Sequence, residues 1–324
     1  MIRRRPLVLA APALLPALRS AGAQAPRFPD RPLRLVIPVG VGGVTDIVGR
    51  ILADHMGTTL GRPVVPENVV GAGSTVGALA FHRAAADGYT IFIGTNNHPV
   101  MKAIYPNFPL DPVTDFVPLC LVGRQPFILA VNPEVPVRDV PGLLAWLRQQ
   151  GAAANYGSAN PGATNHMAGE LLKQLGGVTF TIVPYRTAAN AVQDLVAGRV
   201  QLSIDSPSMM APLIRDGRLR ALAVSSPTPS TQFPELPALA EAGVAGYALT
   251  AWQVLFARPG TPPEVLAVLE DAARRAVADP GVRARLAAAN VETWPDSSPA
   301  AAAAHVQAEV ARWVPIAAAI TPGG

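Results

Sequence analysis

Short, mostly apolar runs alternate along the chain with stretches in which apolar positions recur at helical spacing. Leu33–Val39 is such a run, and the apolar positions from Ile47 to Leu60 then recur three or four residues apart. Val64–Asn68 and Tyr89–Gly94 are further short runs, and the pattern between them predicts a helix with Ser74 as its N-cap. This alternation of strands and helices predicts an α/β fold.

The same alternation starts again after a longer β-rich stretch, Phe116–Val131. Strands are then predicted over residues 154–158, 180–184, 200–205 and 219–225, and helices over residues 143–150, 164–175, 189–197 and 209–216. A proline-rich loop from Pro227 and a β-rich stretch ending in Trp252–Ala257 follow. Two alanine-rich helices, Pro263–Ala278 and Pro299–Ile320, complete the chain. The second half therefore repeats the style of the first half without repeating its sequence.

The first 25 residues have the pattern of a cleavable secretory signal. Arg3–Arg5 form a basic start, Pro6–Leu18 an apolar run, and Ala21-Gly22-Ala23 a small-residue cleavage site. The apolar run is too short for the roughly 20 residues that a membrane-spanning helix needs. We therefore expect residues 1–25 to be a signal peptide and the remaining chain to be periplasmic.

The charge balance changes once this segment is set aside. The 324 residues carry a formal charge of +4, from 26 basic and 22 acidic residues. Four of the basic residues lie within residues 1–25, which leaves 22 basic and 22 acidic residues. Half of the chain is apolar and only 15% is charged, so neither a disordered chain nor a nucleic-acid-binding surface is expected. The single cysteine, Cys120, excludes an intrachain disulfide.

Glycine-rich or small polar loops follow several predicted strands where helices begin. They are Gly40–Gly43, Gly71–Ser74 and Ser158–Thr164. Such loops let backbone N–H groups and a helix N-terminus hold an anion, although one loop alone can equally be a tight turn. A dinucleotide fingerprint fits poorly, because its third glycine would fall at Thr45. We therefore expect no cofactor, and an anion site between two lobes.

Patterns of catalytic and metal-binding residues are absent from the sequence. No Gly-x-Ser-x-Gly motif occurs, and the five histidines and Cys120 lack the spacing of a zinc site. Asp46 and Asp205 are a possible carboxylate pair, but no neighbouring acid or base suggests turnover. Asp205 could pair with an amino group of a ligand, or it could cap the helix that contains Met209. We expect no enzyme and no metal site.

Several short motifs, in this order and spacing, resemble the Bug family of extracytoplasmic solute-binding proteins of tripartite tricarboxylate transporters. The likeness runs from about Phe28 to Trp313. It is carried by the sequences at residues 29–32 (PDRP), 38–46 (PVGVGGVTD), 67–68 with 71–73 (EN, GAG), 87–90 (DGYT), 110–112 with 115–116 (LDP, DF), 183–185 (VPY), 217–224 (GRLRALAV) and 260–262 (GTP).

The resemblance implies a two-lobed Venus-flytrap fold of the type II periplasmic-binding-protein class, each lobe a mixed sheet flanked by helices. Residues 26–124 and 225–324 would form lobe 1, residues 125–224 lobe 2, with hinges near 123–131 and 222–226. The ligand would be a small carboxylate, held by residues in both lobes. In lobe 1 these are Val39, Gly42, Gly43, Thr45, Asp46, Gly71, Gly73 and Ser74; in lobe 2 they are Ser158, Gly162, Thr164, His166, Tyr185 and Asp205.

The resemblance also implies partners. A monomer would deliver its ligand to membrane permease subunits, with no role for nucleic acid. Two other functions stay open at this point: a ligand sensor that presents its closed form to a membrane signalling kinase, and an exported hydrolase. The chain departs from the family at Ala163, where a hydroxyl residue is common, and at Arg186-Thr187, where Lys-Gly is common.

Overall fold

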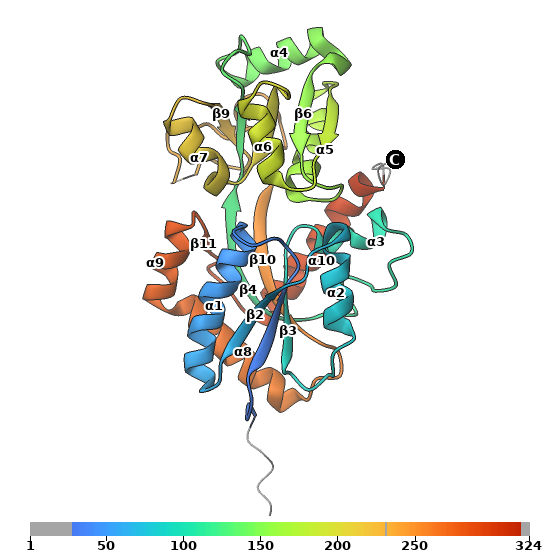
Figure 1. The fold of residues 1–324 in the computed structure, drawn as a ribbon, viewed down its shortest axis with the longest axis vertical. Helices are drawn as coiled ribbons and strands as arrows, with labels where there is room; N and C mark the ends of the chain where they lie inside the picture. Colours follow the sequence, from blue (N-terminus) through green and yellow to red (C-terminus); the bar gives the residue numbers. More distant parts are fainter. Residues whose placement is uncertain (1–27, 231, 319–324) are drawn as a thin grey trace, which may run out of the picture.

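Two sheets, each flanked by helices, form two lobes arranged along the long axis of the molecule (Figure 1). The computed structural model describes residues 28–230 and 232–318, so the predicted signal peptide, residues 1–25, lies outside the described residues. Within this part of the chain, no helix has the length and apolar character needed to span a bilayer. The predicted α/β architecture with two lobes and mixed sheets is confirmed.

The first sheet has six strands in the order β11-β4-β10-β3-β1-β2. β1 runs parallel to β2 and β3, whereas β10 is antiparallel to β3 and β4. The strands are β1 (Leu33–Ile37), β2 (Val64–Asn68), β3 (Thr90–Gly94), β4 (Val117–Pro126), β10 (Thr250–Ala257) and β11 (Glu292–Thr293). The parallel strands therefore end at one edge of this sheet, where the glycine-rich loops follow them.

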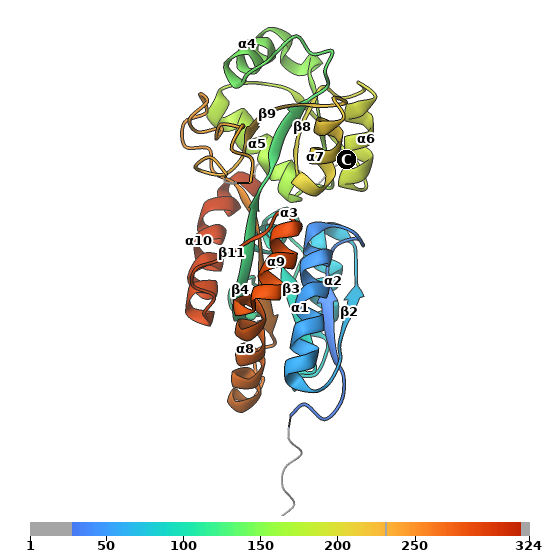
Figure 2. The same cartoon turned by 90° about the vertical axis from the view of Figure 1, so that its left-hand side faces the viewer.

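Helices cover both faces of the first sheet because its central strands are apolar on both sides. Leu33, Leu35 and Ile37 of β1 point to one face, and Val36 points to the other. The first face packs against α1 (Val44–Leu60), α8 (Pro263–Ala278) and α9 (Pro280–Ala288). The second face packs against α2 (Thr75–His82) and α10 (Pro299–Ala317), and the short α3 (Met101–Ile104) lies beside it (Figure 2).

The second sheet has five strands in the order β7-β6-β8-β5-β9. β6 is parallel to β7 and β8, and β5 is antiparallel to β8 and β9. The strands are β5 (Ile128–Val131), β6 (Asn155–Ser158), β7 (Thr181–Pro184), β8 (Leu202–Asp205) and β9 (Arg220–Val224). The helices of this lobe are α4 (Val140–Gln150), α5 (Thr164–Gly176), α6 (Ala188–Val196) and α7 (Pro207–Arg215).

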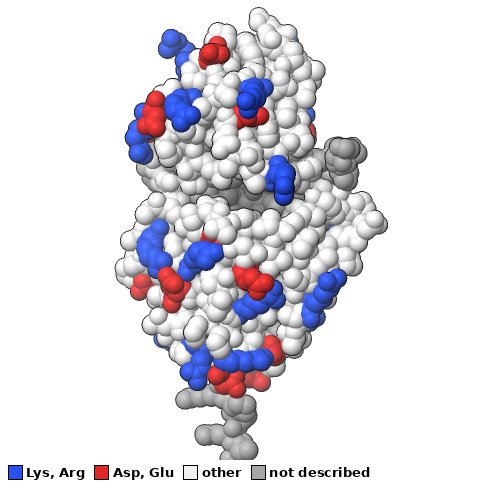
Figure 3. All heavy atoms as spheres, viewed as in Figure 1, with Lys and Arg blue, Asp and Glu red and all other residues white. Residues whose placement is uncertain are grey.

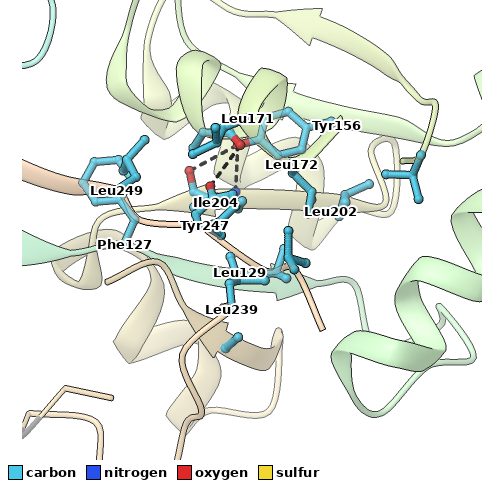
Figure 4. Close-up of a cluster of buried hydrophobic side chains, with 14 of the residues drawn as sticks. Phe127, Leu129, Tyr156, Leu171, Leu172, Leu202, Ile204, Leu239, Tyr247 and Leu249 are labelled. Atoms are coloured by element: carbon cyan, nitrogen blue, oxygen red, sulfur yellow. Dashed lines mark hydrogen bonds between the residues drawn. The ribbon is translucent and has the colours of Figure 1, made fainter. Parts of the chain in front are cut away.

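The core of the second lobe ties the start of α5 to the sheet. The hydroxyl of Tyr156, near the top of Figure 4, donates to the carbonyl of Asn165 at 2.6 Å and accepts from the N–H of Ile204 at 3.1 Å. The hydroxyl of Tyr247 donates to the carbonyl of Ala168 at 3.0 Å. Two buried tyrosine side chains therefore fix the position of the N-terminal turns of α5.

Three segments connect the lobes. The chain passes directly from β4 to β5 at Phe127, and it returns through residues 225–249 between β9 and β10. The predicted lobe boundaries at residues 125 and 225 stay a prediction, although Leu239 and Leu249 pack in the core of the second sheet. The third segment is α10, whose Val306 packs in the first lobe and whose Trp313 packs in the second (Figure 2).

Most predicted elements lie within a few residues of the observed ones. α8 has the predicted bounds, and Ser74 is the N-cap of α2, but its side chain makes no capping hydrogen bond. Cys120 is buried in the core of the first lobe, where burial raises the pKa of its thiol to about 12. α9 was not predicted from the sequence, because Pro280-Gly281 resembles a loop although Pro280 begins the helix and Asp279 caps it.

Candidate functional site

A cavity of about 160 Å³ lies between the two lobes. A cavity of this size has room for several water molecules, so it suits a small organic molecule. A groove crosses the molecule at this level in the space-filling view of Figure 3. The cavity is lined by Val39, Gly43, Val44, Thr45, Thr95, Asn97, Phe127 and Ala251, and by Ala159, Ala163, Thr164, Asn165, Ala188, Asp205, Ser206 and Met209.

The N-termini of two helices, one from each lobe, border this cavity. α1 begins at Val44 and α5 at Thr164, and both residues line the cavity. The first N–H groups bonded within each helix are those of Ile47 and Met167, so the N–H groups ahead of them have no intrahelical acceptor. The partial positive charge of each N-terminus adds to these donors. The two lobes therefore present facing sets of N–H donors to one space.

Asp46 holds the loop that precedes α1. Its carboxylate accepts from the N–H of Gly42 at 2.9 Å and from Nδ2 of Asn68 at 2.8 Å, and it pairs with Arg50 at 2.9 Å. Nδ2 of Asn68 also donates to the carbonyl of Val39 at 2.9 Å. Burial raises the pKa of Asp46, but hydrogen bonds from Arg50, Gly42 and Asn68 outweigh it, so the net pKa lies below its usual value. Asp46 is therefore an ionised anchor for the loop.

A second loop of the first lobe supports the cavity wall from behind. Gly71 precedes a single 3₁₀ turn, Ala72–Ser74, which contains Gly73, and the hydroxyl of Ser74 donates to the carbonyl of Pro38 at 3.4 Å. Nδ2 of Asn97 donates to the hydroxyl of Ser74 at 3.2 Å, and Asn97 itself lines the cavity. Ser74 therefore positions Asn97, while the two glycines do not reach the cavity.

Asp205 ends β8 and lines the cavity from the second lobe, with 3% of the residue exposed. Its carboxylate accepts from the N–H of Ser206 at 2.7 Å and from Nδ2 of Asn165 at 2.8 Å. Burial raises its pKa, and hydrogen bonds from Ser206 and Asn165 offset only part of that effect. The N-cap of α7 is Ser206, so Asp205 does not occupy the capping position considered from the sequence.

The remaining predicted residues of the second lobe lie outside the cavity. The hydroxyl of Ser158 donates to the carbonyl of Ala159 at 2.9 Å, and Gly162 contacts Ile104 of the first lobe. His166 is buried, burial lowers its pKa, and its Nδ1 has no partner among the described residues. The hydroxyl of Tyr185 donates to Asp194 at 2.7 Å. Burial, and then Asp194, raise the pKa of Tyr185 to about 12.

The structure brings five of the predicted site residues together around the cavity: Val39, Gly43, Thr45, Thr164 and Asp205. Gly42, Asp46 and Ser74 lie directly behind them. Asn97, Asn165 and Ser206 were missed, although each stands in a polar stretch that follows a predicted strand. Ala163, the departure from the family pattern, also lines the cavity, next to the hydroxyl-bearing Thr164.

Charge is sparse around the cavity. Asp205 is the one Asp, Glu, Lys or Arg among its described lining residues. No group of three His, Cys, Asp or Glu side chains in residues 28–230 and 232–318 is placed to hold a metal ion. Charged side chains of both signs are scattered over the face in Figure 3, without a basic patch. Polar recognition at this cavity therefore depends on N–H groups, hydroxyls, amides and one carboxylate.

Among the larger hollows, two that α7 lines differ from this cavity in their walls. One of about 690 Å³ lies against α7, β9 and residues 232–236, and its walls belong to one hydrophobic cluster in which Phe233 and Leu236 pack against β5 and α7. Another of about 470 Å³ lies between the lobes and is lined by Ile47, α7 and α9. Arg215 and Arg285 line this second hollow, and Arg285 pairs with Asp54 at 2.9 Å.

Comparisons with known proteins agree with this geometry. Residues 48–321 match the family model of the tripartite tricarboxylate transporter family receptor. The chain is 33% identical over 258 residues to protein BugT of Bordetella pertussis, covering 78% of this chain and 79% of that protein.

Solved structures show the same similarity. The chain has a TM-score of 0.84 and 34% identity to R. palustris Rpa4515 with adipate, covering 91% of this chain and 100% of that one. For MatC of Rhodopseudomonas palustris with bound malate, the TM-score is 0.82, the identity 31% and the coverage 90% and 100%.

Proposed function

The chain belongs to the tripartite tricarboxylate transporter receptor family, and on this premise we propose that it captures a small carboxylate between its lobes for a membrane permease. The sequence resemblance to the Bug family is confirmed. The family consists of transport receptors rather than enzymes. One observation carries the proposal: helix N-termini from both lobes face one small cavity.

A carboxylate fits these donors physically. Its two oxygens accept several hydrogen bonds, and N–H groups at a helix N-terminus bind anions without a cationic side chain. One carboxylate can bridge α1 and α5 only when the lobes approach each other. Ligand binding would therefore favour the closed arrangement through its higher affinity for that arrangement.

Two similar proteins support this ligand class. The structures of Rpa4515 and MatC hold adipate and malate, and both of these molecules are carboxylates. Arg215, which lines the hollow between α7 and α9, would raise the local concentration of an anion near the lobes.

The proposed location and partner follow from the sequence and the family. The signal-like pattern of residues 1–25 supports export to the periplasm, and the receptor family supports a permease of the tripartite tricarboxylate type as partner. We propose that the protein acts as a monomer. A pull-down with membranes that contain the candidate permease, with and without ligand, tests this partner.

Isothermal titration tests the ligand class. The protein is titrated separately with acetate, succinate, malate and adipate and with the amide of each acid, which keeps the shape of the acid but removes its charge. We expect at least one acid to bind with a Kd below about 100 µM and its amide to bind at least tenfold more weakly, because the helix N-termini favour an anion. Equal affinity for acid and amide, or no binding of any acid at millimolar concentration, would reject the proposal.

A further inference from the structure

The sign of the charge inside the interlobe cavity is opposite to what an anion site alone requires. Asp205 is the one formally charged side chain among the described lining residues, and it is almost fully buried. Burying a carboxylate costs free energy unless donors or cations compensate it. Among the described residues, no Lys, Arg or His lies within ion-pair distance of Asp205, and the compensation inside the protein comes from neutral donors.

Those neutral donors leave part of the carboxylate unused. Oδ1 accepts from the N–H of Ser206 at 2.7 Å, and Oδ2 accepts from Nδ2 of Asn165 at 2.8 Å. An ionised carboxylate has about four acceptor positions. Because Asp205 also lines the cavity, its remaining acceptor capacity is available to a bound molecule.

Each end of the Asn165 amide makes one hydrogen bond within the second lobe. Its Oδ1 accepts from the N–H of Ala159 at 3.2 Å, while its Nδ2 donates to Asp205. This chain of contacts fixes the orientation of the Asn165 side chain and, through it, of Asp205. A ligand in the cavity therefore meets an Asp205 carboxylate whose orientation is fixed.

A purely structural role for Asp205 does not account for its position. The N-cap of α7 is Ser206, and the N–H of Met209 bonds to the carbonyl of Ser206. The Asp205 carboxylate holds one peptide N–H and one amide, which a neutral Asn or Ser could also do. A hydrogen-bond donor on a ligand in the cavity would explain why this position carries a carboxylate.

We propose that Asp205 makes the protein selective for carboxylates that also carry an ammonium or hydroxyl donor. This inference rests on the proposed function: α1 and α5 hold the carboxylate of the ligand, and Asp205 accepts a hydrogen bond from its second group. A second carboxylate placed there would face a like charge. The ligand class is therefore small amino or hydroxy acids that fit about 160 Å³.

Titration with a matched ligand series tests the inference. Butyrate, 2-hydroxybutyrate and 2-aminobutyrate have the same carbon skeleton and differ in one donor group, and succinate replaces the donor with a second carboxylate. For the unaltered protein we expect the hydroxy or amino acid to bind at least tenfold more tightly than butyrate and succinate. Equal affinities across the series would overturn the proposal without any variant.

Asp205→Asn tests the residue itself. The amide keeps the size of the side chain but loses its charge and one acceptor oxygen. We therefore expect the tenfold preference to fall below about threefold, while butyrate affinity changes less than threefold. Asp194→Asn, which alters an acid of α6 outside the cavity, should leave the preference unchanged. An equal loss for every ligand in Asp205→Asn would assign Asp205 a structural role and overturn the proposal.

The outcomes separate this inference from the proposed function. If no acid in this series or among acetate, malate and adipate binds, both fail. If the plain and donor-bearing acids bind equally well, carboxylate capture stands and the role of Asp205 is rejected.

Discussion

Asp46 shows how one buried carboxylate can act on a ligand that it does not touch. It fixes the loop before α1 through Gly42 and Asn68, and that loop carries Gly43 and Val44 to the cavity. The geometry of the first-lobe donors therefore depends on a side chain one layer behind them.

Replacing Asp46 by Asn removes the charge from this anchor. We expect Asp46→Asn to weaken carboxylate binding about tenfold and to lower the free energy of unfolding by about 1–3 kcal/mol, because charge-assisted hydrogen bonds are lost. Isothermal titration and urea unfolding measure the two effects. Asp54→Asn is the control on the same helix, since its exposed pair with Arg285 contributes little. Similar effects from both variants would contradict the anchoring role.

His98 gives a prediction about pH. It is fully buried between Phe116 and Phe256, and burial lowers its pKa to about 4, although Nε2 donates to the carbonyl of Pro112. Above pH 6.5 the imidazole is neutral in both folded and unfolded chains. As the pH falls from 6.5 towards 4, the unfolded chain takes up a proton that the folded protein does not, so stability decreases.

The His98→Gln variant isolates this contribution, because the amide keeps a donor for Pro112. Between pH 6.5 and 4 we expect the unaltered protein to lose roughly 3 kcal/mol more of its free energy of unfolding than the variant loses. Urea unfolding at a series of pH values measures the difference. Parallel pH profiles would show that His98 does not titrate as its burial implies.

At the scale of elements, the loop before α5 contacts the other lobe. Gly162 has φ +80°, and a Cβ there would lie 2.4 Å from Cδ1 of Ile104 in α3. Ala at this position is therefore strained in its backbone and pushes against the first lobe. The glycine allows the two lobes to approach at the cavity.

Gly162→Ala should weaken ligand binding about tenfold, because the loop and the buried Ile104 side chain must move apart and the loop carries the α5 donors with it. Gly177→Ala is the matched control: its φ is +57°, and its Cβ would meet no atom within 4 Å. We expect both variants to lose about 1 kcal/mol of stability and only Gly162→Ala to lose affinity. Isothermal titration measures the affinity of each variant. An unchanged affinity in Gly162→Ala would contradict a role of the contact between Gly162 and Ile104 in ligand binding.

Much of this arrangement could be predicted from the sequence. The spacing of apolar residues predicts the strands and helices, and the small-residue loops after the strands predict where the site lies. Val44 and Thr164 begin helices after small-residue loops, and both lie at the cavity. Asn97 and Asn165 could not be selected in the same way, because polar residues after strands are common and only packing decides which ones face the cavity. Tyr185 shows the same limit, since its hydroxyl points to Asp194.

At the scale of the whole molecule, α10 joins the two lobes. Ala302 and Val306 pack in the first lobe, and Trp313, 2% exposed, packs in the second. Glu309 accepts from the indole N–H of Trp252 in β10 at 2.8 Å and from that of Trp313 at 3.0 Å. Hence α10 packs against both lobes and acts as a brace between them.

Trp313→Ala should lower the free energy of unfolding by about 3–5 kcal/mol, because it opens a cavity in the second core and removes a donor to Glu309. Trp146→Ala, at a half-buried position on α4, should cost less. Urea unfolding compares the two variants. A loss below about 1 kcal/mol for Trp313→Ala would mean that the brace contributes little.

Hydrogen exchange of the backbone amides tests the central claim most directly, that one carboxylate is held by both lobes. The N–H groups of Val44, Thr45, Thr164 and Asn165 have no intrahelical acceptor, so they should exchange rapidly in the free protein. With the carboxylate that binds most tightly in the titrations, we predict slowed exchange at both pairs. Protection confined to one lobe, or located at the hollow beside α7 and β9, would contradict capture between the lobes.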